Sequence, residues 1–547
     1  LGGMHPFIIG VYWIIYLALF SVLLILPLRR TLLTRYAFKI FCKIMPTMSE
    51  TEKEALCAGD VGWTSEIFSG RPDWNKFKKM PYINISEEEQ SFIDGEVEQL
   101  CQLLDDWEIN RTMQIPEEVW KFIKDHRFLS MIISKEYGGL DFSAAAQSQI
   151  ITKIASHSTA VATVVCVPNS LGPAELLQHY GTDEQKQYYL PRLVTGQEIP
   201  CFALTSPTAG SDAASISDHG IVCKAEYEGK EQLCIRLNWN KRYITLCPVA
   251  TLLGLAFKLY DPDHLLGEGE ELGITCALIP TNTPNVVTGR RHFPLHSAFP
   301  NGPTQGVDVL IPVDWIIGGA KMAGQGWRML MECLAAGRGI SLPSVSGGGA
   351  AKQVLTGSAY ARIRQQFNLP IGMFGGVQES LVQIVGYGYL VQALRLFTAS
   401  IIDQGISPVV ASAITKYNAT EYARKGILAS MDMHGGKAIC MGPNNYTAQN
   451  YFETPVAITV EGANILTRSF IIFGQGAIRC HPYVLEELFA GQDEDKQKGS
   501  KRFDKAFCAH VGFILSNNVR ALVLGFTNAY FVKAPDGLRN RPFDRQS

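Results

Sequence analysis

The sequence predicts an α+β protein in which a helical domain, a small β domain and a helical bundle follow one another behind a single transmembrane helix. Three observations lead to this prediction. An uncharged apolar run opens the chain, helical signals dominate before residue 199 and after residue 319, and alternating strand-like runs fill residues 200–318. A chain of 547 residues is long enough for two or three domains with sizeable cores.

Composition and charge indicate an ordinary globular enzyme body. The chain is 47% hydrophobic and 18% charged with a formal net charge of −2, so it lacks the basic footprint of a nucleic-acid-binding protein. Its 13 cysteines show no C-x-x-C spacing, which argues against a zinc site and against a disulfide framework. We therefore expect no metal, no nucleic-acid partner and a reducing compartment.

The first 45 residues predict a membrane anchor with a basic flank. Residues 7–28 carry no charge, and at ~1.5 Å per residue they are long enough to cross the ~30 Å hydrocarbon core of a bilayer. A secretory signal peptide is the alternative, but the run exceeds the usual ~7–15 residues and no small-x-small cleavage site follows. Lysines and arginines follow the run and none precedes it, namely Arg29, Arg30, Arg35, Lys39 and Lys43. The positive-inside rule then leaves the rest of the chain cytoplasmic, with residues 36–45 against anionic headgroups.

Five segments are expected behind the anchor. They are a linker at residues 46–85, an N-terminal helical domain at 86–199, a middle β domain at 200–318, a C-terminal helical domain at 319–487 and a C-terminal extension at 488–547. Ser86 and Glu89 form a capping-box pattern at the start of the first helical domain. Residues 346–349 (SGGG) predict a junction between two helices rather than a phosphate loop.

Two segments of the N-terminal helical domain resemble the acyl-CoA dehydrogenase family. They are residues 136–140 (EYGGL) and 180–191 (YGTDEQKQYYLP), and both are markers of the fold rather than catalytic groups. With the motifs that follow, the resemblance covers about residues 87–487. It implies an acyl-CoA dehydrogenase-like fold, FAD as the cofactor and acyl-CoA as the substrate.

Residues 204–212 (LTSPTAGSD) resemble the family segment that enters the β domain and lies along the flavin. Glycine and small hydroxyl residues let backbone N–H groups and short donors approach a flavin and a thioester. The resemblance implies that Leu204 and Thr205 contact the flavin and that Ser211 lies beside both the flavin and the acyl-CoA. Ser206 stands where the family usually has Glu, so a surface contact is expected to differ.

Residues 239–245 (WNKRYIT) resemble the strand that covers the flavin with an aromatic ring, here Tyr243, and offers a hydroxyl to flavin N5, here Thr245. A donor at N5 stabilises the negative charge that develops there when hydride arrives. Leu246 replaces the usual Asn of the family, so the neighbouring contacts are expected to differ.

Residues 360–371 (YARIRQQFNLPI) resemble the family signature Y-A-x-x-R-x-Q-F-G-x-P-I. The resemblance implies that Arg364, together with Gln366, reaches the flavin pyrophosphate across a subunit interface, where a fork-shaped cation suits a phosphate. Asn368 replaces Gly, which an αL position tolerates.

The turn at Gly435 and Gly436 resembles the one that approaches the flavin of the other subunit, and His434 beside it is interpreted as a structural histidine. These features imply a homodimer or a larger assembly. Arg338 matches the family position that helps to hold the acyl-CoA, with a helix-capping cation as the alternative reading.

Residues 459–466 (TVEGANIL) resemble the family segment whose Glu is the catalytic base, here Glu461. A carboxylate inside an apolar run is costly to bury, which independently marks Glu461 as a candidate functional group. Ala463 and Ile465 replace residues that often touch the flavin adenylate, so that contact is expected to be weaker.

The nearest resemblance is to the bacterial long-chain, FadE-type branch of the family. It implies FAD-dependent conversion of medium- to long-chain acyl-CoA to trans-2-enoyl-CoA in fatty acid β-oxidation, with electrons passed to an electron-transferring flavoprotein. It also implies a bacterial inner-membrane location with a cytoplasmic catalytic domain, and a shortened C-terminal extension. Two alternatives stay open, an acyl-CoA oxidase that uses oxygen and a non-catalytic membrane scaffold of the same fold.

Overall fold

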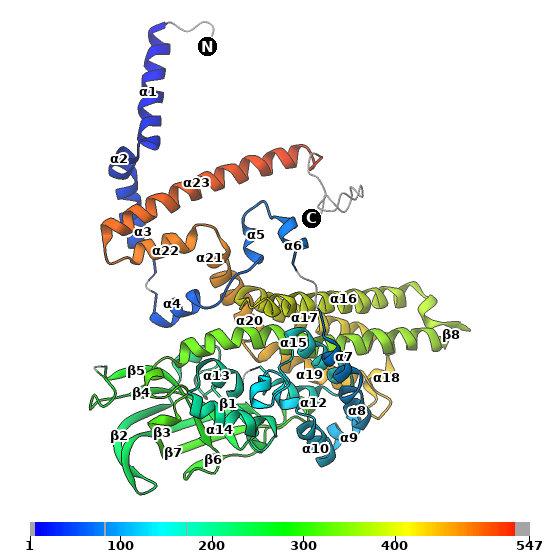
Figure 1. The fold of residues 1–547 in the computed structure, drawn as a ribbon. Helices are drawn as coiled ribbons and strands as arrows, with labels where there is room; N and C mark the ends of the chain where they lie inside the picture. The colour runs from blue at the N-terminus through cyan, green and yellow to red at the C-terminus, as the bar shows by residue number, and fades with distance from the viewer. Residues whose placement is uncertain (1–5, 47, 81–83, 171, 268, 531–547) are drawn as a thin grey trace. The chain divides into compact units, whose positions relative to one another are not determined.

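The computed structural model describes residues 6–46, 48–80, 84–170, 172–267 and 269–530, and the chain divides into two compact units (Figure 1). Unit 1 comprises Leu1–Glu52, Trp63–Met80 and Gly474–Ser547, and unit 2 comprises Lys53–Gly62 and Pro81–Phe473. The last part of the predicted extension, residues 531–547, lies outside the described residues. All the predicted site residues belong to unit 2.

Unit 1 joins segments from the two ends of the sequence. Its elements are α1 (Pro6–Leu24), α2 (Leu26–Arg29), η1 (Arg30–Thr34), α3 (Arg35–Ile44), α5 (Thr64–Phe68), α6 (Trp74–Lys78), α21 (Ala477–Cys480), α22 (Val484–Gln492) and α23 (Lys496–Phe526). Arg29 and Arg30 contact the buried carboxylate of Asp504 at 2.9 and 3.2 Å, and the Thr34 hydroxyl donates to it at 2.6 Å. The segment after the apolar run is therefore fixed to α23.

One face of α3 is buried against α23. The rings of Phe38 and Phe41 lie 5.3 and 4.9 Å from the ring of Phe503, measured between centroids. Tyr36 and Ile40 are exposed on the other face. The predicted headgroup contact of residues 36–45 can therefore involve only the exposed face.

The predicted linker, residues 46–85, contains short helices. α4 (Glu50–Cys57) comes first, and α5 and α6 follow. The ring of Trp63 lies 5.1 Å from that of Trp74 and 4.8 Å from that of Phe77. This aromatic cluster gives the segment a small core of its own.

Three helices among the described residues are long and apolar enough to cross a bilayer, judged by length and composition alone. They are Phe7–Leu24 of α1, α16 (Gly375–Asp403) and α23, and the bent pair Ala448–Thr459 and Asn464–Cys480 would make a fourth. α16 is part of the helical bundle of unit 2 and is partly buried there, whereas the Phe7–Leu24 window has no buried residue. A transmembrane helix at the N-terminal apolar run stays a prediction.

The first part of unit 2 is helical, as predicted. It contains α7 (Glu87–Asp94), α8 (Glu96–Leu103), α9 (Asp106–Thr112), α10 (Glu117–Asp125), α11 (Ala144–His157), α12 (Thr159–Cys166), α13 (Pro173–Tyr180) and α14 (Asp183–Val194). α7 opens with the expected capping box, in which the Ser86 N–H donates to the Glu89 carboxylate at 2.7 Å and the Glu89 N–H donates to the Ser86 hydroxyl at 3.3 Å.

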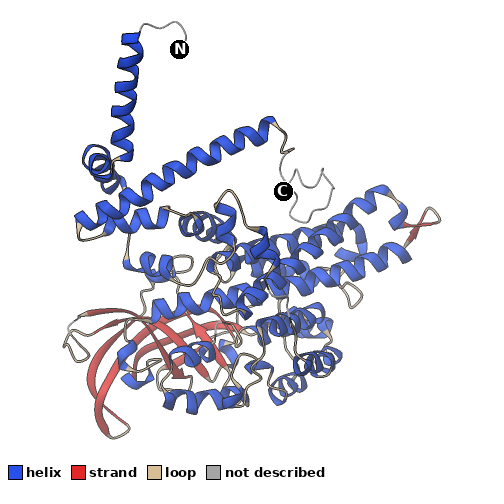
Figure 2. Ribbon diagram, turned by 45° about the horizontal axis from the view of Figure 1, so that its top comes forward, coloured by secondary structure: helices blue, strands red, loops and turns tan. Residues whose placement is uncertain are grey.

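A mixed seven-stranded sheet follows, shown as red arrows in Figure 2, and confirms the middle β domain. Its strands are β1 (Pro200–Ala203), β2 (His219–Tyr227), β3 (Lys230–Thr245), β4 (Leu252–Tyr260), β5 (Glu271–Pro280), β6 (Val286–Thr288) and β7 (Asn301–Pro312). The order is β1-β4-β2-β3-β7-β6, with β5 paired to β4. β4 runs parallel to β1 and β2, and its sequence LLGLAFKLY is almost wholly buried because both its faces are covered.

Long helices form the C-terminal part of unit 2, also as predicted. α15 (Gly326–Ile363), α16 and α17 (Val409–His434) lie side by side, and α18 (Gly436–Ile439), α19 (Ala448–Thr459), α20 (Asn464–Leu466) and η10 (Thr467–Gly476) follow (Figure 1). The predicted helix junction at residues 346–349 is wrong, because these residues lie inside α15. A Cβ on Gly348 would lie 2.5 Å from the Thr152 carbonyl oxygen, so the glycine admits α11 against α15.

Candidate active site

Glu461 lies in the short loop between α19 and α20, where the backbone is bent. The φ angle is +52° at Glu461 and +86° at Gly462. A left-handed conformation costs ~1–2 kcal/mol for a residue with a Cβ, whereas glycine adopts it freely. The bend turns the carbonyl groups of both residues towards flanking helices, each of which supplies a cation.

Arg338 of α15 is the first of these cations. Its Nε donates to the Glu461 carbonyl at 2.8 Å, so this guanidinium contacts the loop of the predicted base. The predicted contact of Arg338 with acyl-CoA stays a prediction. The helix-capping alternative is wrong, because Arg338 lies in the interior of α15.

Lys416 of α17 is the second cation, and the sequence did not single it out. It is fully buried, and its Nζ donates to the Gly462 carbonyl at 2.7 Å. Its partner lies 46 positions along the chain, so no local motif connects the two residues. The available signal was a lysine directly after the small and apolar residues 409–415 of α17, where its burial costs free energy unless it has polar partners.

The carboxyl group of Glu461 is suited to accept a proton. Its Oε2 is buried and has no hydrogen-bond partner within the part of the chain that the structure describes. Burial raises the pKa of Glu461, and the positive charges of Arg338 and Lys416 oppose that rise. A carboxylate with a raised pKa and an unoccupied oxygen can serve as a general base for a molecule bound beside it.

A buried lysine holds residues 204–206. Lys241 of β3 is fully buried and donates to the Leu204 carbonyl at 2.9 Å, to the Ser206 hydroxyl at 3.2 Å and to the Asp218 carboxylate at 2.6 Å. The expected surface contact at Ser206 is wrong, because this side chain is only 1% exposed. Asp218 supplies the carboxylate that balances the charge of Lys241.

Residues 204–206 are also joined to the end of β3. The backbone N–H of Arg242 donates to the Thr205 carbonyl at 3.0 Å. Leu204 and Thr205 are half-buried beside this junction, and Ser211 is exposed in the loop that follows. The three residues predicted to meet the flavin and the acyl-CoA thus lie on one loop of the β domain.

Tyr243 and Thr245 lie at the same end of β3. Tyr243 is 59% exposed, and its ring centroid lies 5.3 Å from that of His292. The Thr245 hydroxyl accepts from the Asn301 side-chain amide at 3.2 Å, so its own O–H can still donate elsewhere. Leu246 has a φ of +67°, a strained conformation that is held by full burial of its side chain.

Arg364 and Gln366 lie beside and within a small hairpin at the far end of α15. The hairpin consists of β8 (Gln365–Gln366) and β9 (Leu369–Pro370), and its turn has φ values of +53° at Phe367 and +61° at Asn368. The αL position expected for Asn368 is therefore confirmed. Arg364 is exposed and has no ion-pair partner among the residues described.

Gly435 and Gly436 lie near this hairpin, at the end of α17. Gly435 has φ +56° and ψ −128°, a conformation that is essentially restricted to glycine. His434 before it is buried, its Nδ1 lies 2.7 Å from the Ser430 carbonyl and its ring stacks on Tyr360 at 4.4 Å. These contacts fit the interpretation of His434 as a structural residue.

The predicted site residues therefore form separate groups within one chain. One group lies on the β domain, and a second comprises Arg364, Gln366, Gly435 and Gly436 at the hairpin end of the helical bundle. Figure 1 shows β8 at the opposite end of unit 2 from the strands of the sheet. Glu461 lies on the bundle between α15 and α17.

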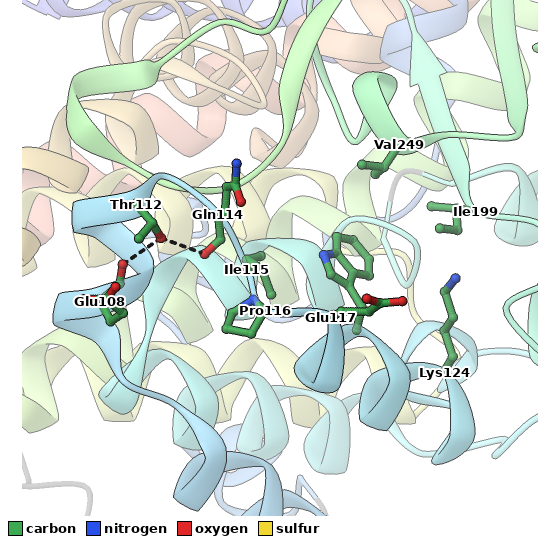
Figure 3. Close-up of a pocket in the computed structure, with 10 residues that line it drawn as sticks. Glu108, Thr112, Gln114, Ile115, Pro116, Glu117, Lys124, Ile199 and Val249 are labelled. Carbon is green, nitrogen blue, oxygen red and sulfur yellow. Dashed lines mark hydrogen bonds between the residues drawn. The ribbon is translucent and has the colours of Figure 1, made fainter.

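Of two hollows on unit 2, one lies near a predicted site residue. Figure 3 shows one of about 590 Å³ between α9, α10 and the start of the sheet, lined by residues that include Trp120, Glu117 and Ile199. None of the predicted site residues lines it. The other, of about 700 Å³, includes Arg290 and His292 in its lining, and the latter neighbours Tyr243.

Sequence models of one enzyme family match four consecutive stretches of the chain. They are "Acyl-CoA dehydrogenase, N-terminal domain" at residues 84–197, "middle domain" at 201–299, "C-terminal domain" at 324–472 and "Acyl-CoA dehydrogenase, C-terminal, bacterial type" at 478–546. Together these stretches cover most of the chain and follow the order of the domains in the structure.

The chain is also similar to individual proteins, and one of the two reported next carries the name of this family. The chain is 67% identical over 94 residues to "Protein HemX" of Proteus mirabilis, and 26% identical over 388 residues to "Probable acyl-CoA dehydrogenase FadE10" of Mycobacterium tuberculosis. The matches cover 17% and 69% of this chain, but only 55% and 57% of those relatives. The solved structure of butyryl-CoA dehydrogenase from Megasphaera elsdenii is similar in fold, with a TM-score of 0.64 at 19% identity over 72% of this chain and 99% of that one.

Proposed function

This chain belongs to the acyl-CoA dehydrogenase family, and from that premise we propose that it uses FAD to oxidise acyl-CoA thioesters between Cα and Cβ. The observation that carries the proposal is the Glu461 carboxyl group. Its Oε2 is buried without a hydrogen-bond partner among the described residues, burial raises its pKa, and Arg338 and Lys416 hold the backbone carbonyls of Glu461 and Gly462. Structural side chains do not need that arrangement, whereas a general base does.

Glu461 removes the α-proton of the bound thioester onto its carboxylate. The proton beside a thioester is very weakly acidic, so the thioester carbonyl must receive a hydrogen bond as enolate character develops. The backbone N–H of Glu461 has no acceptor among the described residues and is a candidate donor for that carbonyl. When bound, FAD accepts the hydride that leaves from Cβ.

The residues of the β domain fit the isoalloxazine end of FAD. Thr245 has a hydroxyl proton to donate, Tyr243 offers an exposed ring, and Leu204 and Thr205 lie on a loop that Lys241 fixes. Ser211 and Arg338 are proposed to contact the acyl-CoA as well. At the hairpin end, Arg364 and Gln366 are suited to the pyrophosphate, because their polar groups are exposed. The space beside Gly435 is open, with no atom within 4 Å of its Cβ position.

We propose a homodimer, because one chain does not bring the two groups of FAD-binding residues together. The hairpin exposes apolar side chains that a second copy would cover, with Phe367 at 89% and Ile363 at 77%. Arg364 would then complete the FAD site of the partner subunit. Sedimentation of the purified protein tests the assembly, and a stable monomer with full FAD occupancy would contradict it.

For the location we propose the cytoplasmic face of the inner membrane, held by the apolar run of α1. The flanking cations support this orientation. The packing of Phe38 on Phe503 defines the truncation that tests it, because removal of about 45 residues would uncover the core of unit 1. Deleting residues 1–24 alone should release active enzyme from the membrane fraction. A full-length protein that is soluble without detergent would refute the anchor.

The proposed substrate is a medium- to long-chain acyl-CoA in β-oxidation, and the proposed electron acceptor is an electron-transferring flavoprotein. The similarity to FadE10, a probable acyl-CoA dehydrogenase, supports acyl-CoA as the substrate, whereas chain-length preference depends on the depth of the acyl cavity. The two alternatives give different results. Peroxide formation under air would identify an oxidase, and a purified chain that retains no flavin would identify a scaffold.

Anaerobic bleaching of the bound flavin by acyl-CoAs of graded length tests the function directly. Glu461→Gln should still bind FAD and acyl-CoA, while bleaching slows at least ~100-fold, the low end of what a general base contributes. The matched control is Glu379→Gln, which removes an exposed carboxylate of α16 and should leave bleaching unchanged. Equal bleaching by wild type and Glu461→Gln would show that the base is another residue.

A further inference from the structure

The loop that carries Glu461 is tied to α17 as well as to α15. Lys416 donates to the Gly462 carbonyl at 2.7 Å and to the Asn464 side-chain oxygen at 2.8 Å. The Asn464 amide in turn donates to Thr420 and to Glu421, both at 3.0 Å. α17 therefore holds the part of the loop that follows Glu461, whereas Arg338 of α15 holds Glu461 itself.

Burial of Lys416 costs desolvation free energy. Its side chain is fully buried, and a buried ammonium loses its hydration unless hydrogen bonds and a nearby charge replace it. Its two hydrogen-bond acceptors are neutral oxygens of the loop that carries Glu461. A neutral donor could form the same hydrogen bonds to those oxygens. Hydrogen bonding alone therefore does not explain why a charged residue is buried here.

The charge of Lys416 and the Glu461 carboxyl group also attract each other. Burial lowers the pKa of Lys416 to about 8 and the attraction of Glu461 opposes this, so the lysine is charged at neutral pH. Arg338 of α15 is the other cation that acts on Glu461, and it contacts the carbonyl of the same residue. From α12, the Cys166 thiol also faces Glu461 but is neutral, because burial raises its pKa.

We propose that Lys416 is a positioning residue for the base, which fixes the bent loop through Gly462 and Asn464 and supplies a buried positive charge beside the Glu461 carboxylate. Burial alone raises the pKa of that carboxyl group and so disfavours the ionised form, which is the form that accepts a proton. A cation held on the inner side of the loop favours the ionised form without occupying the free oxygen. The inference rests on the proposed function of Glu461.

Lys416→Met tests both parts of the inference in the full-length, FAD-loaded protein. With the charge gone, the acid limb of the bleaching rate against pH should move about one pH unit to the alkaline side, because an opposite charge had lowered the pKa of the base. With the contacts gone, amide hydrogen exchange in residues 460–467 should accelerate at least ~10-fold while other bundle peptides keep their rates. Lys416→Arg, which keeps the charge, should restore the pH profile.

Two control variants separate positioning from stability. Asn464→Ala removes one contact of Lys416 and keeps the charge, so it should speed loop exchange without moving the acid limb. Arg395→Met removes another buried cation of the bundle, one that contacts Ser148 and Gln149, and should move neither quantity. If Lys416→Met does not fold, the test rests on loop exchange and on the pH dependence of bleaching in Asn464→Ala. A shift of the acid limb in that variant would overturn the inference.

The outcomes also distinguish this inference from the function on which it rests. If no acyl-CoA bleaches the flavin of the wild-type protein, the proposed function is refuted. Hydrogen exchange in the loop would still show whether Lys416 holds the bend. Wild-type bleaching together with an unchanged pH profile and unchanged loop exchange in Lys416→Met would overturn the role of Lys416 alone.

Discussion

The buried pair of Lys241 and Asp218 offers the sharpest test of how the β domain holds the predicted flavin loop. Asp218→Asn keeps the shape of the side chain but removes the carboxylate that lies 2.6 Å from a fully buried ammonium group. Breaking a buried pair from one side costs ~3–5 kcal/mol, because the remaining charge is left uncompensated. Lys241→Met should cost less, since Asp218 still accepts from the Asn240 N–H at 2.7 Å and from Ser206.

The double variant of Asp218→Asn and Lys241→Met should lose less stability than the two single variants lose in sum. It contains no buried charge, so we expect at least ~2 kcal/mol of coupling between the two positions. Native-state hydrogen exchange of the β3 amides measures the opening free energy of this region directly and avoids the assumption of two-state unfolding for the whole chain. Additive effects, or a loss below ~1 kcal/mol for Asp218→Asn, would refute the argument. FAD should dissociate faster from Asp218→Asn, because Lys241 also holds the Leu204 carbonyl.

Three further predictions concern other parts of the chain. Burial, with the nearby Asp106, raises the pKa of Glu453 to about 7. The folded state therefore binds a proton that the unfolded state releases, and the free energy of unfolding falls as pH rises from ~4.5 through ~7. Glu453→Gln should remove up to ~3 kcal/mol of that fall, which a smaller Tm difference between pH 5.5 and 8 would show. Asp504→Asn should leave Arg29 uncompensated and accelerate exchange in α3 and α23 by ~100-fold or more, with unit 2 unchanged. Arg364→Ala should lower FAD occupancy while the apoprotein keeps the wild-type Tm, whereas the neighbouring exposed Arg362→Ala should change neither quantity.

Local chemistry explains the features that could be predicted from the sequence. The capping box of Ser86 and Glu89 involves residues three positions apart, and the αL turn at Asn368 depends on the side chain at that position. The order of helices and strands likewise follows from the periodicity of the residues within each segment. The candidate base was assigned by resemblance to a family segment, and the cost of a carboxylate within an apolar run supported the assignment independently.

The features that could not be predicted depend on contacts between distant segments. The glycines around Gly348 suggested a break, but they serve the approach of α11 to α15, which only the packed structure reveals. Ser206 looked like a changed surface residue until Lys241 and Asp218 were found around it. The role of Lys416 likewise becomes visible only when α17 meets the loop after α19.

The contact between Arg29 and Asp504 has a consequence for biosynthesis. The two residues are 475 positions apart, so a ribosome adding ~5–20 residues per second makes the carboxylate roughly 25–95 s after the arginine. Throughout that interval Arg29 and Arg30 are unpaired cations directly behind a nascent apolar helix, which is when the insertion machinery reads such charges. If α1 is inserted as proposed, the same two arginines first orient the helix and later close unit 1. One substitution at either arginine could then impair the orientation of the helix early in synthesis and the folding of unit 1 later.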